Sequence, residues 1–483
     1  MPDINILAAA AYLPILRFDR KAARGALGWA GLGGPGRGTR SVAGWDEDSL
    51  TMAVEAARGV LGGNNGGDIA RVTFASTSSP FIDRSQSGVL IEALQLDSRA
   101  EALDVSGTRR CAVAALSRAL GNGAAGTELV VAGEDRHAQP GSSASMNWGA
   151  GAGAVLVGEG PGIARLIARA TVNFDLLDIY TSAKRGDPYA AEDRFVRDET
   201  VAHVYVPAFK AALEQAGLSG ADIALAVVPE PVGGTYGQAA RGLKIAAPNV
   251  CEEIAAAAGE LGSAMPLFGL ALALERANAG DRILLAGFGN GCEALILEAT
   301  GKPPVATATE ALDRGAVFNN YIRFLSLTDS LSLDWGPRAE VNQKTSASTL
   351  ARHGRDTHGF VGGRDARGNV QFPKTPIPVS PQAEGPEQYQ DVVLRDVPAK
   401  VTSVTADRLN FTPDPPFYFG LVQFENGARV AMEYCDCEGN TPKVGDPLVM
   451  RFRIKAIDRQ RDFRTYFWKA APIERPVLAK ETK

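Results

Sequence analysis

The sequence has 483 residues, a formal net charge of −5 and a composition that is 45% hydrophobic and 22% charged. A chain of this length exceeds one ordinary domain, so we expect two or three units with a large buried core. The slightly acidic balance lacks the basic surface of a general nucleic-acid binder, and no nucleic-acid partner is expected. Only four histidines and five cysteines are present, which leaves few ways to build a histidine-rich metal site.

The apolar segments and the cysteines indicate a cytoplasmic protein. Residues 4–16 form an apolar stretch with no basic segment ahead of it, unlike a secretory signal peptide. The most apolar later run, residues 261–274, spans 14 residues, and crossing a bilayer takes about 20. The cysteines follow no regular spacing, which is typical of reduced intracellular thiols. We therefore expect no membrane partner.

Residues 1 to about 300 alternate short apolar runs with helical stretches. This alternation predicts an α/β architecture in which buried sheets are connected by crossover helices. Short aliphatic runs bounded by turn residues predict strands, and apolar residues at helical spacing predict helices. The expected strands are residues 72–76, 128–132, 154–157, 223–228 and 282–286, and the expected helices are residues 49–61, 112–120, 201–216 and 266–277.

Two segments of this region look like copies of one unit. Cys111 is followed by a helix, a glycine-rich turn and the strand 128–132, and Ser263 is followed by a helix, a turn and the strand 282–286. This repeat predicts a duplicated architecture. The alternative, that any two strand–helix units share such a pattern, stays open on these residues alone.

The composition and the periodicity of the sequence change after Thr300. Residues 301–400 are rich in proline and show little helical periodicity. Beyond Asp391, short segments with the alternation of β-strands recur between turns that contain Asn-Gly, Gly-Asn or Gly-Asp pairs. Short strands at this spacing, without a long helix, predict a small barrel. The expected strands are residues 400–404, 417–424, 428–434, 448–454 and 464–468.

Cys111 stands just before the alanine-rich helix 112–120. At a helix N-terminus the free amide groups and the helix dipole stabilise a thiolate, and Arg109 and Arg110 add positive charge if they face the sulfur. A thiolate in this place is a candidate nucleophile, and the same amides can hold an oxyanion. The alternative is that Cys111 is a small buried hydrophobe, as free cysteine often is.

Several motifs of the first 300 residues occur together in a fixed order. They are residues 38–57 (GTRSVAGWDEDSLTMAVEAA), the Cys111 helix, residues 148–156 (WGAGAGAVL), residues 259–264 (GELGSA) and residues 287–291 (GFGNG). On these motifs the chain resembles hydroxymethylglutaryl-CoA synthases and their relatives, the ketoacyl-ACP synthases III. The resemblance implies the duplicated thiolase fold, with five layers in the order αβαβα, and places Cys111 on the cysteine that this family acylates.

The resemblance also implies a CoA thioester as substrate and no permanently bound cofactor. In such enzymes the cysteine takes an acyl group from CoA, and a carbanion then attacks the thioester or its carbonyl partner. Arg241 and Lys244 lie in a region where the synthases place a lysine for CoA, so both are candidate CoA-binding residues. Ordinary surface charge is the alternative for both. A homodimer or a larger assembly is expected from the same resemblance.

The usual acid–base groups of the family are largely absent. Pro229 stands where the family has the histidine of a His-x-Pro motif, and the family's catalytic glutamate is replaced near Ser78. The asparagine of the synthase III relatives is matched by Glu260. Because proline cannot exchange a proton, another group has to polarise the thioester carbonyl and protonate the product.

Glu230, Glu260 and His137 are the candidates for this role. Glu230 follows Pro229 directly, Glu260 belongs to the motif 259–264, and His137 follows the expected strand 128–132. Each has a plain alternative, because a carboxylate can stand at a helix cap or in a loop, and a loop histidine can be solvated. The candidate catalytic set is therefore Cys111 with these three residues.

The region from about residue 340 to 472 resembles the zinc-ribbon and OB-fold proteins that accompany thiolases. No cysteine lies between Cys292 and Cys435, so a four-cysteine zinc site cannot form and no metal is expected. The likeness rests on residues 359–364 (GFVGGR), 368–373 (GNVQFP) and 445–452 (GDPLVMRF). The expected division is a synthase domain over residues 1–305, a linker with a degenerate zinc ribbon over 306–390, and an OB-fold domain over 391–483.

Three functional hypotheses follow. The first is an acyltransferase or synthase that makes or breaks a carbon–carbon bond on a CoA thioester through acyl-Cys111. The second is a non-catalytic accessory subunit that binds acyl-CoA and docks a thiolase partner. The third is a hydrolase or aldolase acting on a CoA ester. The absence of the usual histidine and asparagine is what keeps the second and third open.

Overall fold

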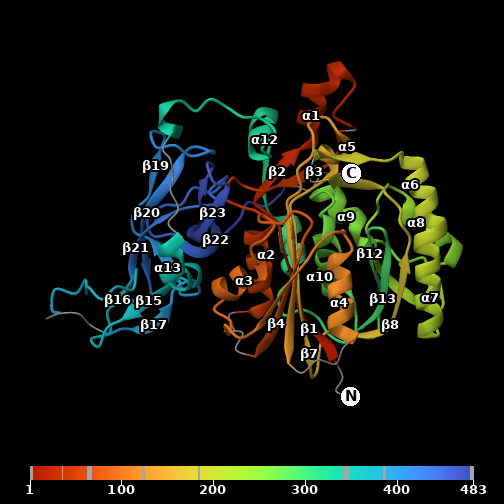
Figure 1. Ribbon diagram of the computed structural model, residues 1–483, viewed down its shortest axis with the longest axis horizontal. Helices are drawn as coiled ribbons and strands as arrows, with labels where there is room; N and C mark the ends of the chain where they lie inside the picture. Colours follow the sequence, from red (N-terminus) through yellow and green to blue (C-terminus); the bar gives the residue numbers. More distant parts are fainter. Residues whose placement is uncertain are drawn as a thin grey trace.

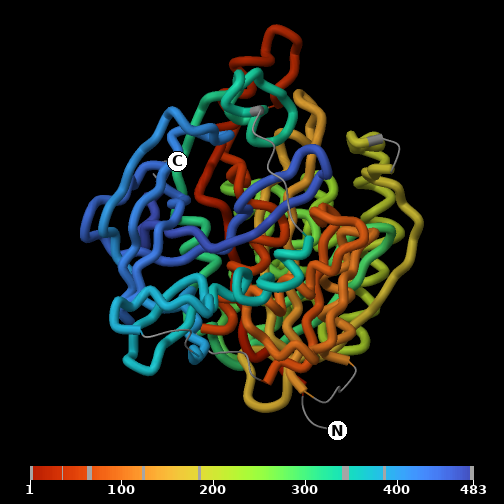
Figure 2. Tube along the Cα trace, turned by 60° about the vertical axis from the view of Figure 1, so that its left-hand side comes forward, coloured from red at the N-terminus to blue at the C-terminus, as the bar shows by residue number. Residues whose placement is uncertain are grey.

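The computed structural model describes residues 4–34, 36–62, 68–121, 126–182, 185–340, 347–383 and 388–478 (Figure 1). The N-terminal residues 1–3 and most of the expected glycine-rich turn, residues 122–125, lie outside these ranges. The described residues fold into a large α/β unit and a smaller β-rich unit, and the two lie side by side in both views (Figures 1 and 2).

A nine-stranded sheet runs through the described part of the large unit. Its strand order is β11-β12-β13-β8-β1-β7-β6-β4-β5. The two halves of this sheet join where β1 pairs with β8 through Asn5–Arg165 and Ile6–Ala164. The strands are β1 (Ile4–Tyr12), β4 (Ile69–Ala75), β5 (Glu101–Val105), β6 (Thr127–Glu134), β7 (Gly151–Glu159), β8 (Ala164–Asn173), β11 (Ile223–Val227), β12 (Arg282–Phe288) and β13 (Gly291–Ala299). The five expected strands of this region are confirmed to within a few residues.

Helices pack on both outer faces of the sheet and fill the space between its halves (Figure 1). Helices α4 (Cys111–Gly121) and α10 (Met265–Arg276) lie at the centre, because each contacts strands of both halves. Helix α2 (Ser49–Leu61) covers β1, β6 and β7, and α7 (Val206–Ala216) covers β8 and β13. The layers therefore follow the order αβαβα, and the expected duplicated architecture is confirmed.

The composition of α10 explains its central position. Every residue from Met265 to Leu274 is buried, and a helix that is apolar all round is stable only inside a protein or a membrane. Pro266 stands in its first turn, where a missing amide hydrogen costs nothing. The apolar run 261–274 is thus core. No described helix combines the length and the apolar character that crossing a membrane requires.

The remaining elements of the large unit connect these layers. They are α1 (Arg20–Leu27), β3 (Thr39–Val42), α3 (Gln86–Ala93), α5 (Ser143–Asn147), β9 (Ile179–Ser182), β10 (Arg185–Ala190), α6 (Asp193–Glu199), α8 (Thr235–Leu243) and α9 (Val250–Ala257). The expected helix 201–216 begins as a π-helical turn, Thr200–Tyr205, and continues as α7. Pro207 explains the change of register, because it cannot donate the backbone hydrogen bond of a regular α-helix.

Residues 307–327 also pack on the large unit. Strand β14 (Ala316–Phe318) pairs in parallel with β2 (Leu16–Asp19), which in turn pairs with β3. Helix α11 (Thr307–Asp313) contacts α10 and β1, and α12 (Tyr321–Leu327) stacks its Phe324 on Phe18 of β2 with ring centroids 4.3 Å apart. The chain therefore stays with the large unit past the division that we placed at residue 305.

A small sheet and a helix lead into the smaller unit. Helix α13 (Ala347–Gly359) is followed by β15 (Val361–Arg364), β16 (Val370–Gln371) and β17 (Gln390–Val393), which form a three-stranded sheet among the described residues. This sheet occupies the place of the expected degenerate zinc ribbon. In the described ranges, no three His, Cys, Asp or Glu residues gather as metal ligands.

The strands of the smaller unit close on themselves. Strand β20 pairs with β19, β18 and β21, β18 continues to β22 and β23, and a bridge between Tyr434 and Ala470 connects the end of β21 to β23. Phe452 and Trp468, with rings 5.4 Å apart, are buried where β22 and β23 meet α2 and α13, since Arg58 stacks on Trp468 and the Trp468 ring nitrogen donates to the His358 carbonyl. The expected small barrel is thereby confirmed, while its OB-fold assignment stays a prediction. The strands are β18 (Ala399–Val401), β19 (Thr405–Asp407), β20 (Phe417–Phe424), β21 (Arg429–Glu433), β22 (Pro447–Asp458) and β23 (Phe463–Pro472).

The barrel docks on the N-terminal end of α2, and we call this contact region the seam. Asp48 caps α2 by accepting a hydrogen bond from the Thr51 amide (2.9 Å). The same carboxylate accepts hydrogen bonds from the Tyr466 hydroxyl (2.9 Å) and from Arg464 (3.0 Å), both on β23. One side chain thus serves the helix start and the barrel contact together.

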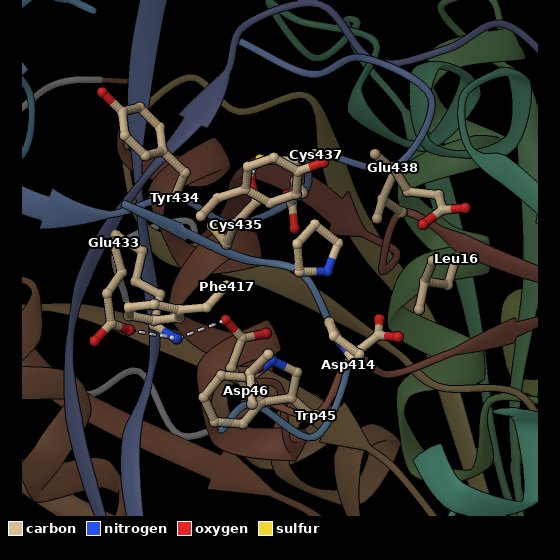
Figure 3. A pocket seen from close by; sticks show the side chains of 18 of the residues that line it. Leu16, Trp45, Asp46, Asp414, Phe417, Glu433, Tyr434, Cys435, Cys437 and Glu438 are labelled. Atoms are coloured by element: carbon tan, nitrogen blue, oxygen red, sulfur yellow. Dashed lines mark hydrogen bonds and ion pairs between the residues drawn. The ribbon is translucent and has the colours of Figure 1, made fainter. Parts of the chain in front are cut away.

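A cavity of about 320 Å³ opens at the seam (Figure 3). Figure 3 shows Asp46 of the large unit and Glu433 of the barrel facing one another across two dashed interactions. These are the contacts of Lys469, whose ammonium group lies 2.9 Å from Asp46 and 3.0 Å from Glu433. Arg323 likewise binds Asp414 at 2.8 Å. The acidic residues of this cavity are therefore held by cations that the fold itself supplies.

Glu55 on α2 is the most deeply buried carboxylate on the opposite side of the seam. It accepts hydrogen bonds from Arg451 (2.6 Å) and from the backbone amide of Phe452 (2.9 Å). Burial alone raises the pKa of Glu55, but the charges of Arg58, Arg451 and Arg453 together with the Phe452 amide outweigh it and lower the pKa to about 2. The ionised form of Glu55 is therefore a stabilising part of the docking contact.

We expect Glu55→Gln to cost about 3 kcal/mol of unfolding free energy at pH 7. Because the folded-state pKa lies below that of the unfolded chain, the contribution is present above about pH 4.5 and is lost as the pH falls toward 2. Urea unfolding of the wild type and the variant at pH 7 and pH 3 measures the difference. Glu214→Gln, on the exposed face of α7, is the control, since its ion pair with Lys210 is exposed. A difference that stays constant between the two pH values contradicts the prediction.

Candidate functional site

Cys111 is the first residue of α4, and only 2% of its surface is exposed. Burial raises the pKa of the Cys111 thiol, the charge of Glu134 raises it further, and the pKa reaches about 12. Hydrogen bonds from Ser263 and from the backbone amides of Cys111 and Ala112 only partly offset this. Burial and a neighbouring carboxylate therefore oppose the stabilisation of a thiolate by the helix amides, and the nucleophilic role of Cys111 stays a prediction.

Glu134 is a functional candidate that the sequence did not single out. It ends β6 and is fully buried. Its Oε1 accepts hydrogen bonds from the Thr77 amide (2.7 Å), the Thr77 hydroxyl (2.9 Å) and the Ser263 hydroxyl (2.5 Å), while its Oε2 accepts one from the Ser78 hydroxyl (2.6 Å). Every donor that the described residues give this carboxylate is neutral. The carboxylate whose charge acts on the Cys111 thiol is thus held by neutral hydrogen-bond donors in this part of the structure.

Glu260 lies in a different electrostatic setting. Burial raises its pKa, but the charges of Arg136 and Arg109 and the Gly262 amide outweigh it, so the pKa of Glu260 is lowered. Arg136 donates a short hydrogen bond to its carboxylate and stacks over the ring of Trp148, 4.0 Å from the ring centroid. The motifs 148–156 and 259–264, far apart in the chain, therefore meet here. Glu260 is locked in an ion pair and holds Arg136 in place.

A cavity of about 350 Å³ has Glu230, Glu260 and Cys251 in its wall, and we call it the Glu230 cavity. Burial raises the pKa of Glu230, although the amides of Tyr236 (2.7 Å) and Gly234 (3.4 Å) donate hydrogen bonds to it. These contacts make Glu230 a cap for the start of α8. Two of the expected site carboxylates are thus brought to one cavity, whereas Cys111 is not among the described residues that line it.

A second cavity of about 480 Å³ is lined by Thr77, Ser78, Thr108 and His137, and we call it the His137 cavity. Arg109, Trp148, Asp178 and Ile179 line both cavities, so the two share a wall. Thr77 and Ser78 also bind Glu134, and Thr108 precedes Cys111 by three residues. The Cys111–Glu134 pair therefore lies directly behind the wall of the His137 cavity.

His137 lies at the rim of its cavity rather than beside the thiol. Its side chain is 43% exposed, its Nδ1 is 3.1 Å from the Thr328 carbonyl, and its Nε2 is 3.4 Å from Asp187. Asp135 is the more deeply placed titratable group of this cavity, where burial raises its pKa to about 6 against the opposing charge of Arg40. The structure thus separates His137 from Cys111.

Pro229 is buried, and its carbonyl accepts a hydrogen bond from the Tyr205 hydroxyl. Its correspondence to the family histidine stays a prediction. Arg241 and Lys244 lie at the other end of α8 from Glu230, and both are exposed. Neither is found among the described residues that line the two cavities. Their CoA-binding role stays a prediction.

Only weak sequence signals identify Glu134, Ser78 and Ser263 as residues of the site. Glu134 follows the expected strand 128–132, and a polar residue at a strand end is a common place for a site. Gly133, just before it, gives a clearer sign in the structure. An added Cβ there would lie 2.0 Å from the Ser49 carbonyl oxygen. The backbone of α2 and the strand end therefore have to approach closely for Glu134 to reach the thiol.

No family model matches the chain. The curated relatives include the hydroxymethylglutaryl-CoA synthase of Aeropyrum pernix, 29% identical over 290 residues that cover 58% of this chain and 80% of that protein. The hydroxymethylglutaryl-CoA synthase of Pyrococcus horikoshii is 28% identical, with 60% and 84% covered. Both alignments extend over most of the relative and leave about two fifths of this chain unmatched.

Solved structures agree with this relationship. An HMG-CoA synthase complexed with CoA matches with a TM-score of 0.55 and 18% identity, covering 68% of this chain and 87% of that one. The 3-oxoacyl-(acyl carrier protein) synthase III of Pseudomonas aeruginosa matches with a TM-score of 0.53 and 19% identity, covering 63% and 100%. The chain is therefore similar in sequence to hydroxymethylglutaryl-CoA synthases and shares the fold of the HMG-CoA synthase and synthase III structures. The five-layer unit of this synthase-like protein is accordingly the duplicated thiolase fold.

Proposed function

We propose that this protein is an acyltransferase that makes or breaks a carbon–carbon bond on a CoA thioester through an acyl group carried on Cys111. The observation that carries the proposal is the position of Cys111. It starts the central helix between the two halves of a thiolase fold, next to a buried carboxylate and behind a cavity wall. The relatives are named hydroxymethylglutaryl-CoA synthases, and one solved neighbour is described as complexed with CoA.

In this reaction the Cys111 sulfur attacks the thioester carbonyl carbon, and CoA leaves as its thiol. We infer that a backbone amide at the start of α4 stabilises the negative charge that develops on the carbonyl oxygen. A carbon nucleophile then takes the acyl group from the sulfur. Glu230, whose pKa is raised by burial, is the carboxylate suited to accept a proton in the Glu230 cavity. Glu260 instead fixes Arg136 as a positive charge in the wall of the His137 cavity.

Incubation with a panel of acyl-CoAs, followed by intact-mass spectrometry, tests the proposal. We expect at least one donor to add the mass of its acyl group, with CoA released in equal amount. Proteolytic digestion should place the adduct on the peptide that contains Cys111. Acylation confined to other cysteines, or no adduct with any donor under turnover conditions, contradicts the proposal.

A second candidate function is an accessory subunit that binds acyl-CoA without reacting. The observations that favour it are the buried Pro229 in place of the family histidine and the raised pKa of Cys111. Stable acyl-CoA binding without an adduct, together with co-purification of a thiolase, would support it. Steady release of the free acid from acyl-CoA would instead favour the third hypothesis, a hydrolase that acts on a CoA ester. Under either enzyme hypothesis we infer that the protein is cytoplasmic and forms a homodimer or a larger assembly. Light scattering measures the mass of that assembly.

A further inference from the structure

The three carboxylates near the site differ in what holds them. Glu260 is bound to Arg136, and Glu230 is held by the amides that begin α8. Glu134 has only neutral donors among the described residues, and it is the one whose charge acts on Cys111. Burying a carboxylate that only neutral groups hydrogen-bond is costly, because such hydrogen bonds compensate its charge only in part.

Ser263 connects this carboxylate to the thiol. It is fully buried in the turn Gly262–Ala264, which packs against both α4 and β6, and its hydroxyl donates to Glu134 Oε1 at 2.5 Å. A hydrogen bond from Ser263 also lowers the pKa of the Cys111 thiol. The Thr77 amide and the Ser78 hydroxyl fix the other lone pairs of the carboxylate (2.7 and 2.6 Å). The carboxylate is thus held in one orientation, with one oxygen directed at the hydroxyl that touches the sulfur.

We propose that Glu134, acting through Ser263, is the base that removes the proton of Cys111. The assignment rests on the acyl-Cys111 chemistry proposed above. As the sulfur attacks, the thiol proton moves to Ser263 Oγ and the serine proton moves to Glu134. A sulfur–carbon bond forms to the thioester carbonyl. When the tetrahedral adduct collapses, the carbon–sulfur bond to CoA breaks, and the proton returns from Glu134 through Ser263 to the departing CoA sulfur.

The electrostatics of the pair support an internal transfer over ordinary ionisation. A thiolate beside an ionised Glu134 places two like charges together in a buried site, and this repulsion contributes to the raised pKa of Cys111. Moving the proton onto Glu134 removes that repulsion, because only one negative charge remains. If the thiol proton leaves to solvent instead, the Cys111 thiolate and the Glu134 carboxylate both stay charged.

The rate of Cys111 alkylation by iodoacetamide between about pH 6 and pH 8 tests the assignment without any acyl donor. In the wild type we expect a nearly flat profile, because the proton stays within the protein. In Glu134→Gln the proton has to leave to solvent, so the rate should rise about tenfold per pH unit. Peptide mass spectrometry reports alkylation at Cys111 alone.

Glu128→Gln is the matched control, since Glu128 is also a buried carboxylate of β6 but is bound to Arg71 and Arg118. It should keep the flat profile. Ser263→Ala keeps the Glu134 carboxylate and removes the hydroxyl that connects it to Cys111. The alkylation rate of this variant should therefore rise with pH as steeply as that of Glu134→Gln. If Glu134→Gln fails to fold, Ser263→Ala provides the test in its place. A Glu134→Gln or Ser263→Ala profile as flat as the wild type overturns the assignment. Failure of every acyl-CoA to acylate the wild type rejects the proposed function instead, and the alkylation profiles still decide the role of Glu134.

Discussion

Cys111→Ala is expected to lower the rate of CoA release from a productive acyl-CoA by at least about a thousandfold. The variant removes the sulfur that forms the covalent intermediate, and no neighbouring group in the described site can replace it, since Ser263 and Glu134 are already bound to one another. Thiol release is followed with a chromogenic disulfide, and the intact mass should show no acyl adduct. Fold should be retained, because alanine fits the small buried position that Cys111 occupies.

Cys292→Ala is the matched control for this experiment. Cys292 is also a fully buried free thiol, but it belongs to β13 and packs in the outer core beneath α7. Burial raises the pKa of Cys292 as well, so the control tests whether any buried thiol contributes. It should keep most of the rate. Equal activity of the Cys111→Ala variant and the wild type would show that the reaction does not pass through this cysteine.

The sequence located the elements of the site better than their chemistry. Aliphatic runs and helical spacing predicted β6, α4 and α10, and these elements position Glu134, Cys111 and Ser263. The sequence argument for a Cys111 thiolate considered only the start of its own helix, whereas burial raises the pKa of this thiol. Burial between two halves of a sheet and a charge from another strand end decide that pKa, and neither is visible in the residues around Cys111.

Glu134 could not be found from sequence for a related physical reason. Its partners Thr77, Ser78 and Ser263 come from two other segments of the chain, and only the fold brings them together. The same holds for the ion pairs of the seam, which connect residues 46–55 of the large unit to residues 451–469 of the barrel. A short pattern predicts an element, whereas a buried charge network depends on how distant elements dock.

The seam network centres on Arg453, the best-enclosed charge of the barrel. Its side chain is fully buried, and its Nη2 lies 2.8 Å from the Tyr12 hydroxyl, 3.0 Å from Asp436 and 3.1 Å from Glu47. Tyr12 and Glu47 belong to the large unit, and Asp436 belongs to the barrel. The guanidinium therefore neutralises carboxylates of both units at once. Burial raises the pKa of Glu47, and the charge of Arg453 is the largest influence that opposes this rise.

Replacement of Arg453 with methionine is expected to cost about 3–5 kcal/mol of unfolding free energy at pH 7. Methionine fills much of the volume but leaves Glu47 buried without its cation, and an unpaired buried charge is strongly destabilising. Arg475 still binds Asp436 at 3.0 Å, so the loss should centre on Glu47. Denaturant unfolding measures the effect, with the exposed Arg429 on β21 changed to methionine as the control.

The double variant Glu47→Gln/Arg453→Met separates a charge effect from lost packing. If the cost of Arg453→Met comes from an unpaired Glu47, neutralising that carboxylate should restore a substantial part of the stability. The single variant should also lose less at pH 5 than at pH 7, because a buried carboxylate without its cation takes up a proton as the pH falls. A cost no larger than that of Arg429→Met would mean that the two units are held together by their apolar contacts alone. Equal stability of the single and double variants would assign the loss to packing around the arginine stem.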